Sequence, residues 1–221
     1  MNIFKIVIAL LIFFLNNSVY AYKESTHEYL SSNALNISAL FVDQTLLSDL
    51  GLQSFSNEQK FTNPNDINGE KITINELVKN GARFEDSLPR FLNHFYDPIN
   101  NIPLTVGVEL GLRSTDWALE DNGDVTSALA GAQNYSYKEA MNYFLLALTS
   151  QAKNVREQNW GNLFQTLGQV IHHVQDMAQP DHTVFGSGLY CCIISKTYVR
   201  GSGLYYCIIS NTQISYYKTK N

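Results

Sequence analysis

The chain has 221 residues, of which 45% are hydrophobic, so it can form one well-packed domain with a short appendage. Its formal net charge of −5 offers no basic surface to a nucleic acid backbone, which excludes duplex nucleic acid as a partner held by charge. The three cysteines, Cys191, Cys192 and Cys207, all lie near the C-terminus, so the body of the chain is not a disulfide scaffold.

The first 21 residues have the pattern of a secretory signal peptide. Lys5 gives a positive start, residues 6–15 form an unbroken apolar run, and Val19-Tyr20-Ala21 is a small-x-small cleavage signal. The apolar run is too short to cross a bilayer, although a membrane anchor is the alternative interpretation. We expect cleavage after Ala21, a mature chain that begins at Tyr22, and a secreted or periplasmic protein.

Hydrophobic periodicity predicts an all-α body over residues 22–183. The expected elements are helices joined by loops. They are a helical region over 22–50 with Thr26 as N-cap, a loop over 51–71, a short helix over 72–78 with Gly81 just past its end, a loop over 100–111, a helix beginning near 114, a helix over 136–152 and a last helix over 155–178. No strand is expected before residue 184.

The last 38 residues, 184–221, differ in composition from the body. Residues 186–195 recur almost unchanged as residues 201–210, and the tail contains no His, Asp or Glu. Two copies are too few for a repeat domain. The tail is therefore either a small β-hairpin-like appendage or sequence foreign to the domain, and we favour the second interpretation.

A cluster of metal-capable side chains lies near the end of the predicted last helix. His172 and Asp176 are four residues apart, so they share one face of a helix, and Gly168 leaves room on that face one turn earlier. Pro180 ends the helix, which allows His182 to return towards the same face. Imidazole and carboxylate at this spacing suit zinc; the alternative is a core histidine beside an acid at a helix end.

A second dense segment, residues 84–98, contains further candidates. Arg90 is expected to pair with Glu85 or Asp86 rather than with phosphate, and Trp117 and Trp160 are expected to pack in the core. The metal-capable groups of the whole chain, in order, are the Tyr22 amine, His27, Asp86, His94, His172, Asp176 and His182.

Three motifs resemble those of the zinc-dependent phospholipase C family and of its relatives, the single-strand-specific nucleases and 3′-nucleotidases. The first is His172-x-x-x-Asp176-x-x-Gln179-Pro180-x-His182, and the second is His94-Phe95-Tyr96-Asp97-Pro98, which resembles the phospholipase branch. The third is the pair Tyr22 and His27, since the family chelates zinc through its mature N-terminal residue. The resemblance covers residues 22–183.

The resemblance implies a multi-helix domain that holds three zinc ions in a cleft. One zinc would be bound by the main-chain nitrogen and oxygen of Tyr22 with His27 and Asp176. Its neighbour would be bound by Asp86, His94, His172 and Asp176, with Asp176 bridging the two ions. His182 would belong to the third ion, and Asp86 would also orient the attacking water or accept its proton.

The sequence departs from the family pattern at three points. Tyr22 stands where the family usually has Trp, and Asp86 lies only eight residues before His94, which leaves Glu85 as the alternative ligand. The family completes its third zinc with a His-x-x-x-Glu on a further helix, which has no counterpart after His182. We therefore expect two complete zinc sites, an incomplete third one and a domain whose last helix or helices are missing.

The implied function is that of a secreted zinc-dependent phosphodiesterase, in which zinc-activated hydroxide attacks phosphorus. A phospholipase C acting on phospholipids, with peripheral contact to membranes, is the favoured interpretation. The alternatives are a single-strand nuclease or 3′-nucleotidase of the same superfamily, and a truncated zinc-binding protein with weak activity. Neither the head-group preference nor the oligomeric state follows from the sequence.

Overall fold

A computed structural model describes residues 23–53, 59–105, 108–119, 126–127, 129, 131–183, 205–210 and 213–218. The predicted signal peptide, Tyr22 and most of the tail lie outside these residues. Within the described part of the chain, no helix has both the length and the apolar character required to cross a membrane.

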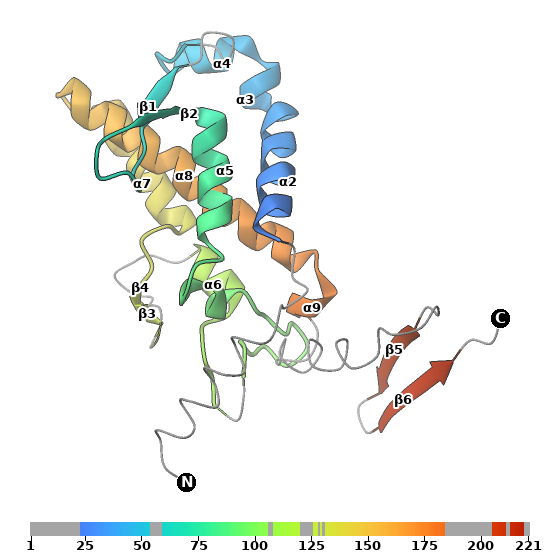
Figure 1. Ribbon diagram of the computed structural model, residues 1–221. Helices are drawn as coiled ribbons and strands as arrows, with labels where there is room; N and C mark the ends of the chain where they lie inside the picture. Colours follow the sequence, from blue (N-terminus) through green and yellow to red (C-terminus); the bar gives the residue numbers. More distant parts are fainter. Residues whose placement is uncertain are drawn as a thin grey trace.

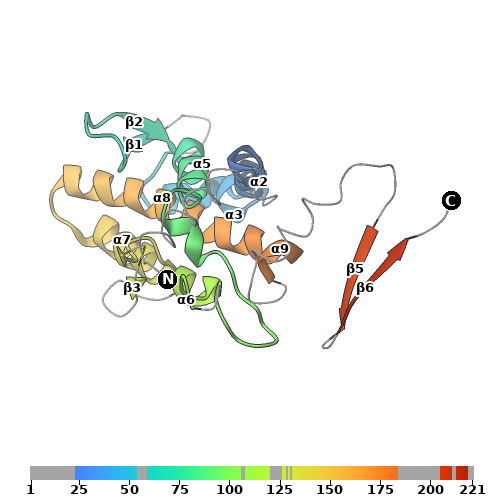
Figure 2. The same ribbon diagram turned by 60° about the horizontal axis from the view of Figure 1, so that its bottom comes forward.

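The fold is mainly helical and is built around one long helix, α8 (Lys153–Met177). Helices α5 (Ile74–Phe84) and α7 (Tyr137–Thr149) both pack along α8, and α2 (Glu24–Asn36) packs on α5. Figure 2 shows α2 and α5 on one side of α8 and α7 with α6 (Ser114–Leu119) on the other. This arrangement brings segments from the beginning, middle and end of the chain together (Figure 1).

Short elements complete the body. They are α3 (Ala39–Val42), α4 (Gln44–Asp49), the 3₁₀-helix η2 (Arg90–Asn93) and α9 (Pro180–Thr183). The expected helical region over 22–50 is therefore divided into three helices, and the first begins at Glu24 rather than after Thr26. The first break falls at residues 37–38 and the second at Asp43, whose side chain accepts a hydrogen bond from the Thr45 amide and so caps α4.

The prediction that no strand precedes residue 184 was wrong. Strands β1 (Lys60–Thr62) and β2 (Lys71–Thr73) form an antiparallel hairpin with Phe61 opposite Ile72, and β3 (Thr126–Ser127) pairs with β4 (Gly131–Ala132). These strands are too short for alternation to be visible in the sequence. The first hairpin matters to the core because it buries Phe61 completely.

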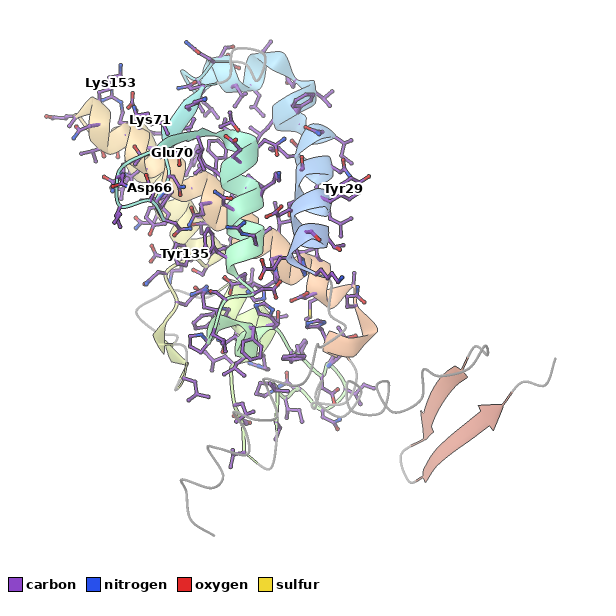
Figure 3. All side chains as sticks on the ribbon, in the orientation of Figure 1. Tyr29, Asp66, Glu70, Lys71, Tyr135 and Lys153 are labelled. Carbon is purple, nitrogen blue, oxygen red and sulfur yellow. The ribbon has the colours of Figure 1, made fainter. Side chains whose placement is uncertain are left out.

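The first hairpin is also tied to the beginning of α8 by charge. Lys71 Nζ on β2 lies 2.6 Å from Glu157 Oε2, and Lys153 Nζ lies 3.8 Å from Glu157 Oε1. Figure 3 labels both lysines at this end of the helix. The pairs are largely exposed, so each contributes little to stability.

The core lies where α5, α7 and β1 meet α8. Phe61 packs against Trp160 and Phe164 with ring-centroid distances of 6.5 and 6.0 Å. Trp160 and Trp117 are both buried, which confirms that they are packing residues. Such aromatic side chains bury large apolar areas and dominate the stabilisation of a core.

Two glycines allow α5 and α8 to approach closely. A Cβ at Gly168 would collide with the main-chain oxygen of Val78, and one at Gly81 would collide with the main-chain oxygen of Gln165. The expectation that Gly168 makes room for another backbone is confirmed. Gly81 lies inside α5 rather than past its end, since the helix continues to Phe84. Thr73 and Glu76 form a capping box that starts this helix at Ile74.

Near the C-terminus, β5 (Tyr205–Ser210) pairs antiparallel with β6 (Gln213–Lys218). The hairpin joins the second copy of the repeat to the residues that follow it. The first copy, residues 186–195, lies outside the described residues, so the choice between an appendage and foreign sequence stays a prediction.

Candidate metal centre

Four histidines and two aspartates from separate segments converge at the C-terminal half of α8. His27 comes from α2, Asp86 and His94 flank η2, and His172 and Asp176 occupy successive turns of α8. The Asp176 Oδ2 atom lies 3.0 Å from both His94 Nδ1 and His172 Nε2, and Oδ1 lies 3.5 Å from His27 Nε2. The i, i+4 spacing thus places both α8 residues in one site, as expected.

Asp86 approaches the same three imidazoles. Its carboxylate oxygens lie 3.6 Å from His172 Nε2, 3.7 Å from His94 Nδ1 and 4.0 Å from His27 Nε2. The Asp86 side chain is 20% exposed, whereas Asp176 and the three rings are at most 2% exposed. Asp86 is therefore the member of this cluster that faces solvent.

His182 joins the cluster from α9. The Tyr96 amide donates a hydrogen bond to the His182 carbonyl at 3.0 Å, and the Phe95 ring stacks on the His182 ring with centroids 4.9 Å apart. His182 Nε2 then lies 3.7 Å from Asp176 Oδ2. The ligand atoms of His182, His94 and Asp176 lie within 4.8 Å of one another. The assignment of His182 to a third ion stays a prediction.

The three histidines nearest to Asp176 each have one ring nitrogen facing Asp176, the inner nitrogen, and one facing away from it, the outer nitrogen. Each outer nitrogen is hydrogen-bonded to a carbonyl oxygen. The pairs are His172 Nδ1 with Ala82 O at 2.6 Å, His94 Nε2 with Glu85 O at 3.1 Å, and His27 Nδ1 with Gln175 Oε1 at 2.7 Å. A carbonyl only accepts, so the outer nitrogen carries the proton. In a neutral ring the inner nitrogen then presents a lone pair to the centre, which is how histidine ligands are oriented in metal sites.

These orientations leave the centre rich in electron pairs. The inner nitrogens His94 Nδ1 and His172 Nε2 are 3.1 Å apart and face each other. Among the described residues, neither Asp176 carboxylate oxygen makes a hydrogen bond of good geometry, although both are buried. The nitrogen lone pairs and the buried Asp176 carboxylate repel one another at these distances. A cation between them is therefore needed to stabilise the arrangement. Imidazole nitrogen with carboxylate oxygen is a donor set that fits zinc and other divalent transition metals.

In the metal-free protein, a proton on His172 supplies the positive charge at the centre. Burial would lower the pKa of His172, but Asp176 and Asp86 outweigh burial and raise it to about 9. Burial, together with the His172 charge, lowers the pKa of His27 to about 4 and that of His94 to about 3. The cluster thus retains one imidazolium next to two neutral rings, and a metal ion must displace its proton.

The two carboxylates titrate in opposite directions. Burial, opposed by His172 and reinforced by the neighbouring Asp176 charge, raises the pKa of Asp86 to about 7. Burial would also raise the pKa of Asp176, but His172 and His94 outweigh it and hold that pKa well below its ordinary value. Asp176 is therefore the permanent anion of the site, while Asp86 exchanges a proton near neutral pH.

The structure places six of the seven predicted ligands together, and Tyr22 lies outside the described residues. Glu85, the alternative to Asp86, does not face the centre, since its carboxylate binds Arg90 at 2.8 Å, which confirms the predicted partner of Arg90. Sequence reasoning missed Gln175 and the main-chain carbonyl of Ala82, because neither has a local signal. How the ligands divide among ions stays a prediction.

Searches of protein families, curated proteins and solved structures found no match to this chain. The resemblance to the phospholipase family therefore depends on the three sequence motifs. The helical fold and the buried His and Asp cluster, which could hold a metal ion, are compatible with a zinc enzyme.

Proposed function

We propose that this protein is an exported, zinc-dependent phosphodiesterase of the phospholipase C type, with a phospholipid as substrate. The observation that carries the proposal is the convergence of His27, His94 and His172 on Asp176, with Asp86 on the open side. The motif at 172–182 resembles both branches of the superfamily, whereas the motif at 94–98 favours the phospholipase branch; together they supply two of these three histidines.

Zinc bound at this centre would activate water for attack on phosphorus and would offset the negative charge of the phosphate. Around it, the chain supplies orientation. Ala82, Glu85 and Gln175 hold a proton on the outer nitrogen of each ring, so that the inner nitrogens face the centre without ring rotation. Only His172 must also lose the proton on its inner nitrogen. Burial of Asp176 excludes water from the inner side of the site.

Asp86 is suited to a proton-transfer role. Its carboxylate is the partly exposed one of the two, so it is within reach of a water molecule on the open side of the site. A carboxylate oxygen of Asp86 would accept the proton of the attacking water. Because Asp86 also approaches three imidazoles, its replacement would weaken metal binding as well as proton transfer.

Hydrolysis assays with matched substrates test the proposal. The mature protein loaded with zinc is incubated with a phosphatidylcholine analogue and, separately, with single-stranded DNA, and phosphocholine or nucleotide release is measured. We expect release of phosphocholine, and its loss in the Asp176→Asn variant. Activity on DNA alone would make the protein a nuclease, and zinc binding without either activity would make it a metal-binding protein; each result contradicts the proposal.

A further inference from the structure

A second set of buried polar side chains lies next to the candidate metal centre, on the Nε2 side of His94. We call it the Glu85 cluster; its members are Glu85, Arg90, Ser114, Trp117, Gln133 and His173. The Glu85 side chain is fully buried. The proposed reaction uses none of these side chains. Among the described residues, no hydrogen bond or ion pair joins any of them to Asp86 or Asp176.

Every oxygen of the Glu85 carboxylate is hydrogen-bonded. Oε1 accepts from Trp117 Nε1 at 2.8 Å, from His173 Nε2 at 3.1 Å and from Arg90 Nη2 at 3.0 Å. Oε2 accepts from Arg90 Nε at 2.9 Å. Charge-assisted and two-pronged bonds of this kind are the strongest that side chains form, and the low dielectric of the interior strengthens them.

The partners of Glu85 are themselves fixed. The Arg90 guanidinium lies 5.0 Å from the Trp117 ring centroid and 5.1 Å from that of Tyr135, which Figure 3 labels, and Arg90 Nη2 donates to Gln133 Oε1 at 2.9 Å. Ser114 Oγ lies 2.9 Å from His173 Nδ1. The cluster therefore locks together η2, α6, the segment before α7 and the C-terminal part of α8.

The cluster is not a second metal site, even though ligand atoms of Glu85, His94 and His173 lie within 4.8 Å of one another. Arg90 occupies both carboxylate oxygens, and the His94 Nε2 proton is directed to a main-chain carbonyl. A metal ion there would have to displace a guanidinium from a buried carboxylate, which is strongly unfavourable.

Two residues connect this cluster to the metal centre. The main-chain carbonyl of Glu85 accepts from His94 Nε2 at 3.1 Å, which leaves Nδ1 of the same ring 3.0 Å from Asp176. Asp86 follows Glu85 directly in the chain. The anchoring of one buried side chain thus fixes both an acceptor for one metal-facing histidine and the starting point of a metal-facing carboxylate.

We propose that Glu85 is a positioning residue of the metal centre: its buried carboxylate, held by Arg90, Trp117 and His173, fixes the carbonyl that sets the His94 tautomer and the main chain that carries Asp86. The proposal rests on the metal site of the proposed function, but not on the identity of the substrate. Partners that orient histidine ligands typically change metal affinity 10–100-fold when they are removed.

The first test uses metal-free protein. Long-range ¹H–¹⁵N NMR of ¹⁵N-histidine-labelled protein at pH 8 distinguishes imidazole tautomers, and the five histidines can be assigned with single His→Gln variants. We expect His94 to carry its proton on Nε2 in the wild type and to lose this preference in Glu85→Ala. This readout requires neither metal nor turnover, so it separates failure of the positioning role from failure of the proposed function.

The second test measures zinc affinity by competition with a chelator, well below the unfolding temperature. Glu85→Ala should bind zinc about 10–100-fold more weakly. Leu163→Ala is the matched control, because it removes a buried side chain of the core on α8 without touching the cluster. If Glu85→Ala is poorly folded, Trp117→Phe removes one donor to Glu85 and keeps an aromatic ring, and a several-fold loss of affinity is expected.

Two results would overturn the proposal. One is an unchanged His94 tautomer together with unchanged zinc affinity in Glu85→Ala or Trp117→Phe. The other is a loss of affinity in Leu163→Ala that equals the loss in Glu85→Ala at the same loss of thermal midpoint, since the effect would then come from stability alone.

Discussion

At the scale of single residues, Asp176 is the centre of the site. Its carboxylate contacts His27, His94, His172 and His182, so removing its charge affects every predicted ligand set. We expect Asp176→Asn to weaken zinc binding by on the order of 100-fold or more. Isothermal titration calorimetry checks this, with Glu157→Gln as a control that removes an exposed carboxylate at the other end of α8. Equal zinc affinities in the two variants would contradict the role of Asp176 as a metal ligand.

The pH dependence of zinc binding follows from the same residues. His172, with a pKa of about 9, and Asp86, with a pKa of about 7, hold protons that a metal must displace. Zinc affinity should therefore rise with pH between 6 and 9, about tenfold per pH unit for each proton released. Calorimetry in buffers of different ionisation enthalpy should count between about one and two protons released near pH 6.5. Binding without proton release would be inconsistent with these ligands.

Residue identity and spacing were enough to predict most of the cluster. The i, i+4 pair on α8 and the proline that redirects His182 depend on local geometry, which a sequence shows directly. The roles of Glu85, Gln175 and His173 depend on contacts between residues 32 to 148 positions apart. Such contacts are decided by helix packing, and no local pattern indicates them.

At the scale of elements, the crossing of α5 and α8 positions the site. Gly168 lets the helices touch at Val78, and one turn later His172 Nδ1 reaches the Ala82 carbonyl. The sequence indicated the close approach but not the partner helix. The boundaries of α2 and α5 and the short hairpins were missed because caps and two- or three-residue strands give weak signals.

Gly168→Ala tests this crossing. Alanine is better than glycine in an isolated helix by about 1 kcal/mol, but its Cβ would collide with the Val78 main chain, so we expect a net loss of about 1–3 kcal/mol in unfolding free energy. Zinc affinity should fall as well, because the His172 contact with Ala82 is displaced. Chemical denaturation and chelator competition measure the two effects.

Gly161→Ala is a matched control for that variant. A Cβ at Gly161 would collide with the Thr62 carbonyl of β1, so stability should fall similarly, but this contact lies away from the metal centre. Zinc affinity should stay at the wild-type value. An equal loss of affinity in both variants would show that the α5–α8 crossing has no specific role in the site.

At the scale of the whole molecule, the candidate centre joins α2, the α5–η2 segment and α8. A metal there links parts of the chain that are far apart in sequence, so its removal should destabilise the entire fold. At a zinc concentration of 1,000 times Kd the stabilisation is about 4 kcal/mol, which corresponds to about 8–16 °C in Tm for a domain of this size. Differential scanning calorimetry with and without a chelator measures it, and Asp176→Asn, with its affinity weakened about 100-fold or more, should shift by no more than about 3–6 °C at the same zinc concentration.

The most direct test of the central claim is the metal content of the mature protein. After purification from zinc-supplemented medium and extensive dialysis, inductively coupled plasma mass spectrometry gives the number of ions per chain. The converging histidines and aspartates predict about two zinc ions per wild-type chain and a clear loss in Asp176→Asn. Wild-type protein that is folded but contains no bound zinc or other transition metal would contradict the account.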